Sequence, residues 1–273
     1  MTQPVSIQKP VVDWVTVVAI AAIAISITVS FHEGVHALTC LVVGGHLQEY
    51  SALHASCDST MIWQGKVVAG SAPIANLIVG TVFWVILRNS KNQAPELQFF
   101  LWLFMLMNWL WGAGYWIFSG IANVGDWAKV IEGWNPHWLW RILLIIVGTI
   151  FYSLFVWLGL KELGQMIGGN ASEQVRRAKK LGALSYVTAI LVVLLAGLFH
   201  PDGITGLPAV AGLAAVIGAL SPLIWSMRLI FPARSIAKTA KQPLEIHRKW
   251  GWIAFAGIVV FTYSFVLGRT VVF

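Results

Sequence analysis

The chain has 273 residues, of which 58% are hydrophobic and only 11% are charged. Because roughly a quarter of the residues in soluble domains are charged, this composition excludes an ordinary soluble domain and predicts an all-α polytopic membrane protein in a lipid bilayer. The net charge of +7 does not indicate nucleic-acid binding, since the basic residues concentrate between the apolar segments, as membrane topology requires. The apolar segments are continuous, without the alternation of period two that is typical of a transmembrane β-barrel.

A membrane span needs about 20 mostly apolar residues, and seven segments meet this requirement. If the N-terminus is cytoplasmic, 14 of the 18 Lys and Arg residues fall on the cytoplasmic side. Positive charge is enriched in cytoplasmic loops, so the sequence predicts a multi-pass protein with a cytoplasmic N-terminus. The seven predicted spans cover about 11–43, 66–88, 97–120, 138–162, 181–199, 207–230 and 250–268.

The first apolar segment contains the motif His32-Glu33-Gly34-Val35-His36. Residues four apart lie on one face of a helix, so the imidazoles of His32 and His36 can bind one metal ion. Glu33 lies beside them as a candidate general base. Ionisable groups inside an apolar helix are costly unless they have a partner or a function. The alternative to a metal site is a hydrogen-bonded polar cluster that stabilises helix packing.

Residues 44–65 form the least helical stretch after this motif. The pair Gly44-Gly45, the alternating run His46–Tyr50 and a polar patch predict a small β-hairpin next to the membrane. Such a backbone persists at membrane depth only where it is buried in protein or faces water. Cys40 and Cys57 do not resemble a disulfide framework, so we expect them to be unpaired.

A catalytic zinc ion takes three protein ligands and keeps one open position. His32 and His36 supply two, and Asp126 is favoured as the third. Asp126 directly follows the third predicted span, at the same membrane depth as the two histidines under the predicted topology. The other candidates are His46, Glu49, His54, Glu132 and His137.

The run from His32 to Leu38, followed by Gly44-Gly45, resembles the first active-site helix of the site-2 protease family of intramembrane zinc metalloproteases. In that family a membrane-associated β-hairpin follows this helix. The stretch Ala69–Asn76 is similar to the family motif on the next helix. The resemblance covers about residues 30–130. It implies that Asp126 matches the aspartate ligand and that Asn76 lines the site, where it would hold the substrate or its oxyanion.

This resemblance implies an enzyme that hydrolyses peptide bonds of membrane-embedded protein or peptide substrates, with Zn²⁺ as its cofactor. Glu33 would take a proton from the zinc-activated water, and the hairpin would offer an edge strand to an extended substrate. Residues 1–167 would form a metalloprotease-like core, 168–180 a basic linker and 181–273 a C-terminal unit of three helices. The alternative is a non-proteolytic membrane protein with a structural metal site or a transport role, neither of which needs a general base at Glu33.

Overall fold

The computed structural model describes residues 11–90, 92–168, 171–229 and 244–273. Within these residues, seven helices are long and apolar enough to cross a membrane. The prediction of an all-α polytopic membrane protein is therefore confirmed, and each predicted span overlaps one of these helices. The basic loop 232–249, between the sixth and seventh predicted spans, lies outside the described residues up to residue 243.

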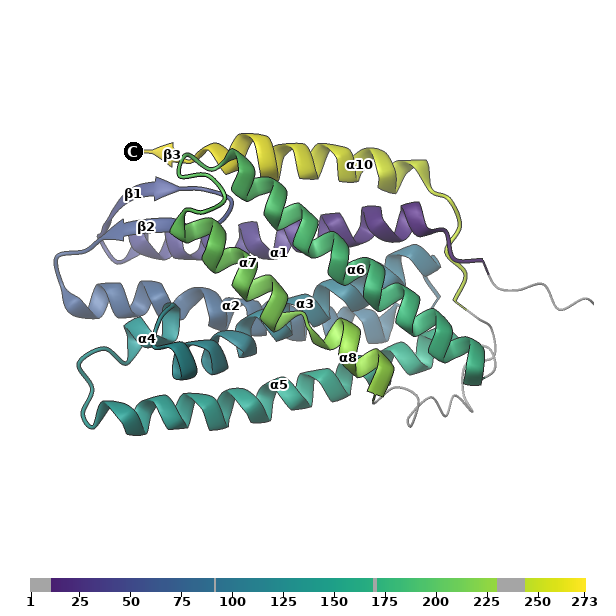
Figure 1. The fold of residues 1–273 in the computed structure, drawn as a ribbon, viewed down its shortest axis with the longest axis horizontal. Helices are drawn as coiled ribbons and strands as arrows, with labels where there is room; N and C mark the ends of the chain where they lie inside the picture. The colour runs from purple at the N-terminus through teal and green to yellow at the C-terminus, as the bar shows by residue number, and fades with distance from the viewer. Residues whose placement is uncertain (1–10, 91, 169–170, 230–243) are drawn as a thin grey trace, which may run out of the picture.

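The helices and strands follow one another in the order shown in Figure 1. The α-helices are α1 (Trp14–Val42), α2 (Ile62–Asn89), α3 (Pro95–Ala122), α4 (Asp126–Val130), α5 (His137–Ile167), α6 (Ala171–Phe199), α7 (Leu207–Ala219), α8 (Pro222–Leu229) and α10 (Trp250–Phe261). A π-helical turn, η1 (Thr262–Val266), and a 3₁₀ turn, η2 (Leu267–Arg269), continue α10. The strands are β1 (His46–Tyr50), β2 (Ala55–Asp58) and β3 (Val271–Val272).

The centre of the bundle is formed by α1 and α3. In the most apolar 18-residue window of each helix, 67% of the residues of α1 and 78% of those of α3 are buried. The corresponding share is 22% in α5 and in the last span. The indoles of Trp102, Trp109 and Trp111 on α3 are almost fully buried. These two helices therefore form the core, whereas α5 and α10 lie at opposite sides of the molecule (Figure 1).

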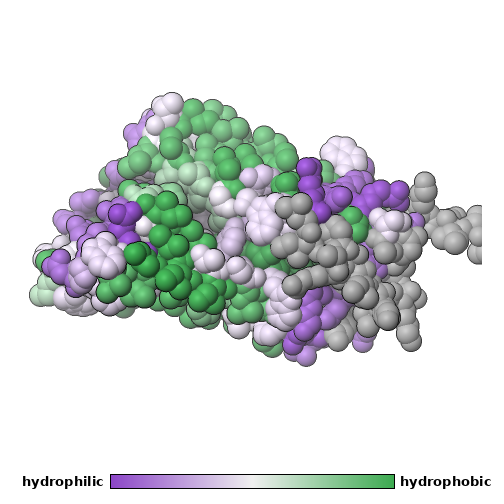
Figure 2. All heavy atoms as spheres, turned by 60° about the horizontal axis from the view of Figure 1, so that its bottom comes forward, coloured by the Kyte–Doolittle hydropathy of each residue, from purple (hydrophilic) through white to green (hydrophobic). Residues whose placement is uncertain are grey.

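Apolar side chains also cover much of the outer surface. On α5, Ile146 and Ile150 are 49% and 60% exposed. Figure 2 shows hydrophobic residues across the middle of the face in view, with hydrophilic residues at both ends. A surface of this kind would be unstable in water but fits the hydrocarbon core of a bilayer.

A three-stranded sheet lies at the end of the bundle where α1 finishes (Figure 1). The predicted hairpin is present, since β1 and β2 pair antiparallel, with an irregularity between Leu47 and Glu49. The sequence did not predict β3, which pairs with the other edge of β1. Because β1 is the central strand, β2 covers one of its edges, and β3 pairs with Glu49 and Tyr50 on the other. The outer edge of β2 is the remaining edge on its side of the sheet.

Cys40 and Cys57 form a disulfide bond, so the expectation that they are unpaired was wrong. Cys40 lies on the last turn of α1, and Cys57 lies on β2. The hairpin folds β2 back over the end of α1, which brings two cysteines 17 residues apart in sequence into contact. The bond ties the hairpin to the helix that carries the HExxH motif.

The helix α6 begins at Ala171, ten residues before the predicted start of the fifth span. Residues 171–180, which the sequence assigns to a basic linker, therefore form the first turns of a helix. Both α6 and α10 pack against α1. The C-terminal helices thus share a core with the N-terminal ones.

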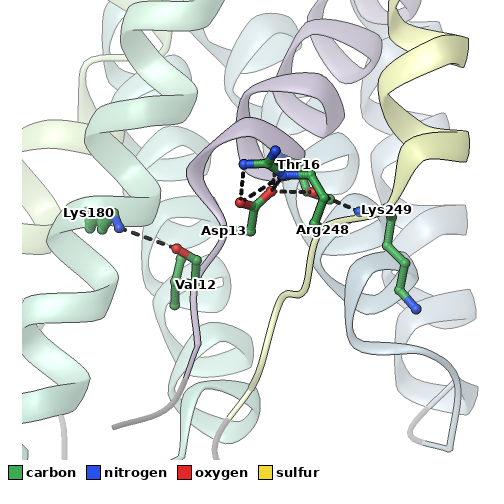
Figure 3. Close-up of polar contacts among 6 residues, drawn as sticks. All are labelled: Val12, Asp13, Thr16, Lys180, Arg248 and Lys249. Atoms are coloured by element: carbon green, nitrogen blue, oxygen red, sulfur yellow. Dashed lines mark hydrogen bonds and ion pairs between the residues drawn. The ribbon is translucent and has the colours of Figure 1, made fainter.

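The start of α1 is tied to the start of α10 by a polar cluster (Figure 3). Asp13 caps α1 by accepting a hydrogen bond from the backbone N–H of Thr16. The Arg248 guanidinium donates to both carboxylate oxygens of Asp13 and lowers the pKa of Asp13 to about 2. The ammonium of Lys180 donates to the carbonyl oxygen of Val12. This cluster lies at the end of the bundle opposite the sheet.

Candidate metal centre

The two histidines of the motif lie one turn apart on α1 and are both buried. Their rings are nearly perpendicular, with centroids 4.8 Å apart. The two Nε2 atoms face each other at 3.3 Å. The helix therefore brings two metal-binding nitrogen atoms to one point, as the spacing of the motif predicts.

Asp126 reaches this point from the turn that follows α3. That turn contains two residues with positive φ, Asn123 at 55° and Gly125 at 85°, which reverse the chain between α3 and α4. The Oδ2 atom of Asp126 lies 3.2 Å from His32 Nε2, and its Oδ1 atom lies 3.4 Å from His36 Nε2. One candidate ligand atom from each of the three residues lies within 4.8 Å of the others. The predicted ligands are thus close together.

A chain of hydrogen bonds fixes the orientation and tautomer of His32. Asn108 Nδ2 donates to the carbonyl oxygen of Phe104, which can only accept. The Oδ1 atom of Asn108 therefore accepts from Asn76 Nδ2 at 2.8 Å. This leaves Asn76 Oδ1 to accept from His32 Nδ1 at 2.7 Å. The Nδ1 atom of His32 consequently carries the proton, and the lone pair of the neutral ring is on Nε2.

The second histidine is held in the same way. Its Nδ1 atom donates to the carbonyl oxygen of Val68 at 2.8 Å. A backbone carbonyl on α2 thus orients the ring of His36, as the side chain of Asn76 orients the ring of His32. Histidines that bind metals usually donate their other N–H to such a partner, which orients the ring.

Asn76, which the resemblance places at the site, lies against His32. Asn76 is fully buried, and its Oδ1 and Nδ2 atoms are both used, by His32 and by Asn108. It therefore orients an imidazole, and its amide keeps one N–H beyond the bond to Asn108. This contact with His32 places Asn76 beside the ligand cluster, and its contact with a substrate or oxyanion stays a prediction.

The three side chains suit a zinc ion. The lone pairs on the two Nε2 atoms would repel each other at 3.3 Å unless a proton or a metal ion lies between them. The buried Oδ2 atom of Asp126 has no hydrogen-bond partner among the described residues. Burial alone would raise the pKa of Asp126, but the positive charges of His36 and His32, when these rings are protonated, lower it more strongly. Two imidazole nitrogens and one carboxylate oxygen form a known ligand set of catalytic zinc.

Glu33 is also buried beside the ligands. Its carboxylate forms no hydrogen bond or ion pair with any residue in the described part of the chain. It is close to Tyr50 on β1, where burial raises the pKa of the phenol and the charge of Glu33 raises it further. The carboxylate is therefore available to accept a proton.

Aromatic side chains from α3 form the opposite wall of the site. The ring of Tyr115 stacks on His32 at a centroid distance of 5.0 Å, and Trp111 meets the same imidazole edge-on. The sequence interpretation did not select Asn108, Trp111 or Tyr115. Their spacing of three and four residues, which places them on one face of α3, was the available signal.

The other candidate ligands lie elsewhere. Among the described residues, the group able to hold a metal contains only His32, His36 and Asp126. The imidazole of His137 is hydrogen-bonded to Asn123, and Glu132 forms an ion pair with Lys129. The remaining candidates not brought into the group are His46, Glu49 and His54.

A polar opening lies next to the turn that presents Asp126. It has a volume of about 660 Å³ and is lined by polar side chains including Asn123, Lys129, Glu132 and His137. Its wall also includes Gly125, the residue directly before Asp126. An opening of this polarity can hold water close to the buried cluster.

Comparison of the chain with protein-family models, with curated proteins and with solved structures finds no match. The interpretation of the site therefore depends on its geometry and chemistry.

Proposed function

We propose that this protein is an intramembrane zinc metalloprotease that resembles the site-2 protease family. The observation that supports this most strongly is the convergence of His32, His36 and Asp126 beside an unpaired Glu33 carboxylate. The convergence joins two distant parts of the chain, and the hydrogen bonds to His32 and His36 leave their Nε2 atoms turned toward Asp126. A structural metal site would need the ligands but not the unpaired base.

In this proposal zinc, when bound, acidifies a water molecule and polarises the scissile carbonyl. Glu33 accepts the proton of that water and later passes it to the leaving amine. Asn76 and the Val68 carbonyl keep the two imidazoles in the required tautomer. Tyr115 covers one face of His32. Water reaches the cluster through the polar opening beside Gly125.

Two observations support a cytoplasmic N-terminus and a site near the outer face of the membrane. Disulfides persist in oxidising compartments and are rare in the cytosol, and the Cys40–Cys57 bond lies at the same end of the bundle as the metal ligands. Positive charge, which marks the cytoplasmic side, concentrates at the opposite end. The described basic residues at that end are Arg88, Lys161, Arg176, Arg177, Lys179, Lys180, Arg228, Arg248 and Lys249, against Lys66, Lys129, Arg141 and Arg269 near the site.

The substitution Glu33→Gln tests the proposed reaction. The purified variant, reconstituted in lipid, should retain zinc near one ion per chain, because Glu33 is not a ligand. It should lose cleavage of a single-span membrane substrate, because a neutral amide cannot accept the proton. Glu245→Gln, at the opposite end of the bundle, is the matched control and should cleave normally.

Two results would contradict the proposal. Cleavage by Glu33→Gln at the wild-type rate would exclude Glu33 as the base. If the wild type bound zinc with His36 as a ligand but cleaved no membrane substrate, the result would instead favour the non-proteolytic alternative.

A further inference from the structure

The C-terminal span changes its winding beside α1. After α10, residues Thr262–Val266 form a π-helical turn before the chain tightens into a 3₁₀ turn. Turns of the π type are rare in proteins and are frequently found at functional sites. Tyr263 lies in this turn and is 1% exposed.

The hydroxyl of Tyr263 is buried and has no hydrogen-bond partner in the described part of the chain. The hydroxyls of Ser264, beside it, and Ser26, on α1, are in the same condition. A buried polar group without a partner is costly and is uncommon in native structures. The phenol is therefore a donor whose partner is not among these residues.

The position of Tyr263 relates this donor to the proposed general base. A cavity of about 380 Å³ between α1 and the C-terminal span is lined by Ser26, Ser30 and Tyr263 together with apolar side chains. Ser26, Ser30 and Glu33 are spaced by four and three residues, so they share one face of α1. Glu33 thus lies on this face, three residues beyond Ser30. The cavity therefore lies against the face of α1 that carries Glu33, on the residues that precede Glu33 in the helix.

Several contacts hold the turn in this position. The backbone N–H of Ala52 donates to the carbonyl oxygen of Leu267 at 2.9 Å, and β3 pairs with β1 directly afterwards. On β1, the hydroxyl of Tyr50 donates to the carbonyl oxygen of Ser30. The hairpin thus contacts both α1 and the segment that directly follows the π-helical turn.

We propose that Tyr263 is a substrate-contacting residue of this site, whose hydroxyl donates a hydrogen bond to a peptide oxygen on the Glu33 side of the ligand cluster. This inference rests on the proposed function. A peptide that is unwound for cleavage within a membrane exposes backbone oxygens that water does not reach. A preorganised phenol supplies a donor to such an oxygen, and the donation strengthens as negative charge develops on it.

The test uses Tyr263→Phe, with Tyr186→Phe as the matched control. The Tyr186 hydroxyl donates to the carbonyl oxygen of Ile217, between α6 and α7. Two probes are titrated into the zinc-loaded protein in lipid nanodiscs: a phosphinic pseudopeptide with a leucine side chain on each side, and acetohydroxamate. The phosphinic group presents tetrahedral oxyanions with flanking peptide, whereas acetohydroxamate reaches little beyond the metal.

For Tyr263→Phe we expect about ten-fold weaker binding of the phosphinic pseudopeptide, because one hydrogen bond is lost. Its zinc content and its binding of acetohydroxamate should be unchanged. Without a probe, the melting temperature of this variant should equal or exceed that of the wild type, because it lacks an unpaired buried hydroxyl. Tyr186→Phe should show the reverse, with a lower melting temperature and normal probe binding.

Unchanged affinity of Tyr263→Phe for the phosphinic pseudopeptide would overturn the inference, and so would a fall in its melting temperature, which would indicate a structural hydroxyl. A wild-type protein that binds zinc but neither probe would overturn the proposed function together with this assignment. Normal probe binding by the wild type and by Tyr263→Phe would leave the proposed function intact and remove Tyr263 alone.

Discussion

The Nδ1 atom of His32 donates a hydrogen bond to Asn76 Oδ1 across 2.7 Å, and this contact decides which nitrogen faces the ligand cluster. Asn76 cannot rotate to offer its amide group instead, because Asn108 Oδ1 already accepts from Asn76 Nδ2. The orientation of Asn108 is fixed in turn by the Phe104 carbonyl. Three helices therefore cooperate to keep one imidazole in one tautomer.

Replacing Asn76 with Ala should weaken zinc binding by about 10- to 100-fold, the range found when the hydrogen-bond partner of a metal-binding group is removed. The imidazole of His32 would lose its acceptor, and its ring could then rotate or change tautomer. Asn76→Asp should recover much of the affinity, because a carboxylate accepts from Nδ1. Competition with a chromophoric chelator measures the affinity of each variant.

Asn89→Ala is the control for this pair, since Asn89 is exposed and its amide donates, among the residues that the structure describes, to Val85 of its own helix. It should bind zinc like the wild type. If Asn76→Ala did so as well, the hydrogen bond to His32 would not contribute to metal binding.

The sequence was sufficient for the parts of the site that a single helix determines. The spacing of His32 and His36 fixes their relative position once the segment is helical. Asp126 is distant in sequence, but a transmembrane fold limits it to the end of the bundle where its span finishes. The predicted depth of Asp126 in the membrane was therefore enough to place it near the histidines, whereas in a soluble protein the tertiary fold would have been needed.

The remaining parts depend on how helices pack against each other. Nothing local in the sequence tells whether the amide of Asn76 meets a substrate or Asn108, because both would suit a polar group in an apolar helix. Pairing of Cys40 with Cys57 required the return path of the hairpin. Tyr263 is separated from Glu33 by most of the chain, and only the packing of α10 on α1 brings it near.

The proposed orientation in the membrane predicts a difference in chemical labelling between the two ends of the bundle. Because both native cysteines are paired, an added cysteine introduces a free thiol. Glu49→Cys lies on the exposed side of β1 near the site, and Asn89→Cys lies at the other end. A membrane-impermeant maleimide applied to intact cells should label Glu49→Cys, and should label Asn89→Cys only after permeabilisation. The opposite pattern would mean that the site faces the cytoplasm.

The polar cluster at the start of α1 predicts how stability changes with pH. Arg248 lowers the pKa of Asp13 to about 2 in the folded protein, from an ordinary value of 3.8. A carboxyl with a lowered folded-state pKa stabilises the fold above its unfolded-state value, and this contribution disappears as the pH falls through the folded-state value. The contribution of Asp13 should therefore be complete above about pH 4 to 5 and lost between about pH 4 and 2.

The substitution Asp13→Asn isolates this charge, because asparagine caps helices about as well as aspartate. Its unfolding free energy at neutral pH should fall by about 1 kcal/mol, the upper range for an exposed ion pair. Asp13→Ala also loses the cap to Thr16, so its unfolding free energy should be lower by about a further 1 kcal/mol. Melting temperatures in detergent from pH 7 to pH 3 test this. The wild type and Asp13→Asn should converge as the pH is lowered, and a constant difference would show that the charge of Asp13 does not stabilise the contact with Arg248.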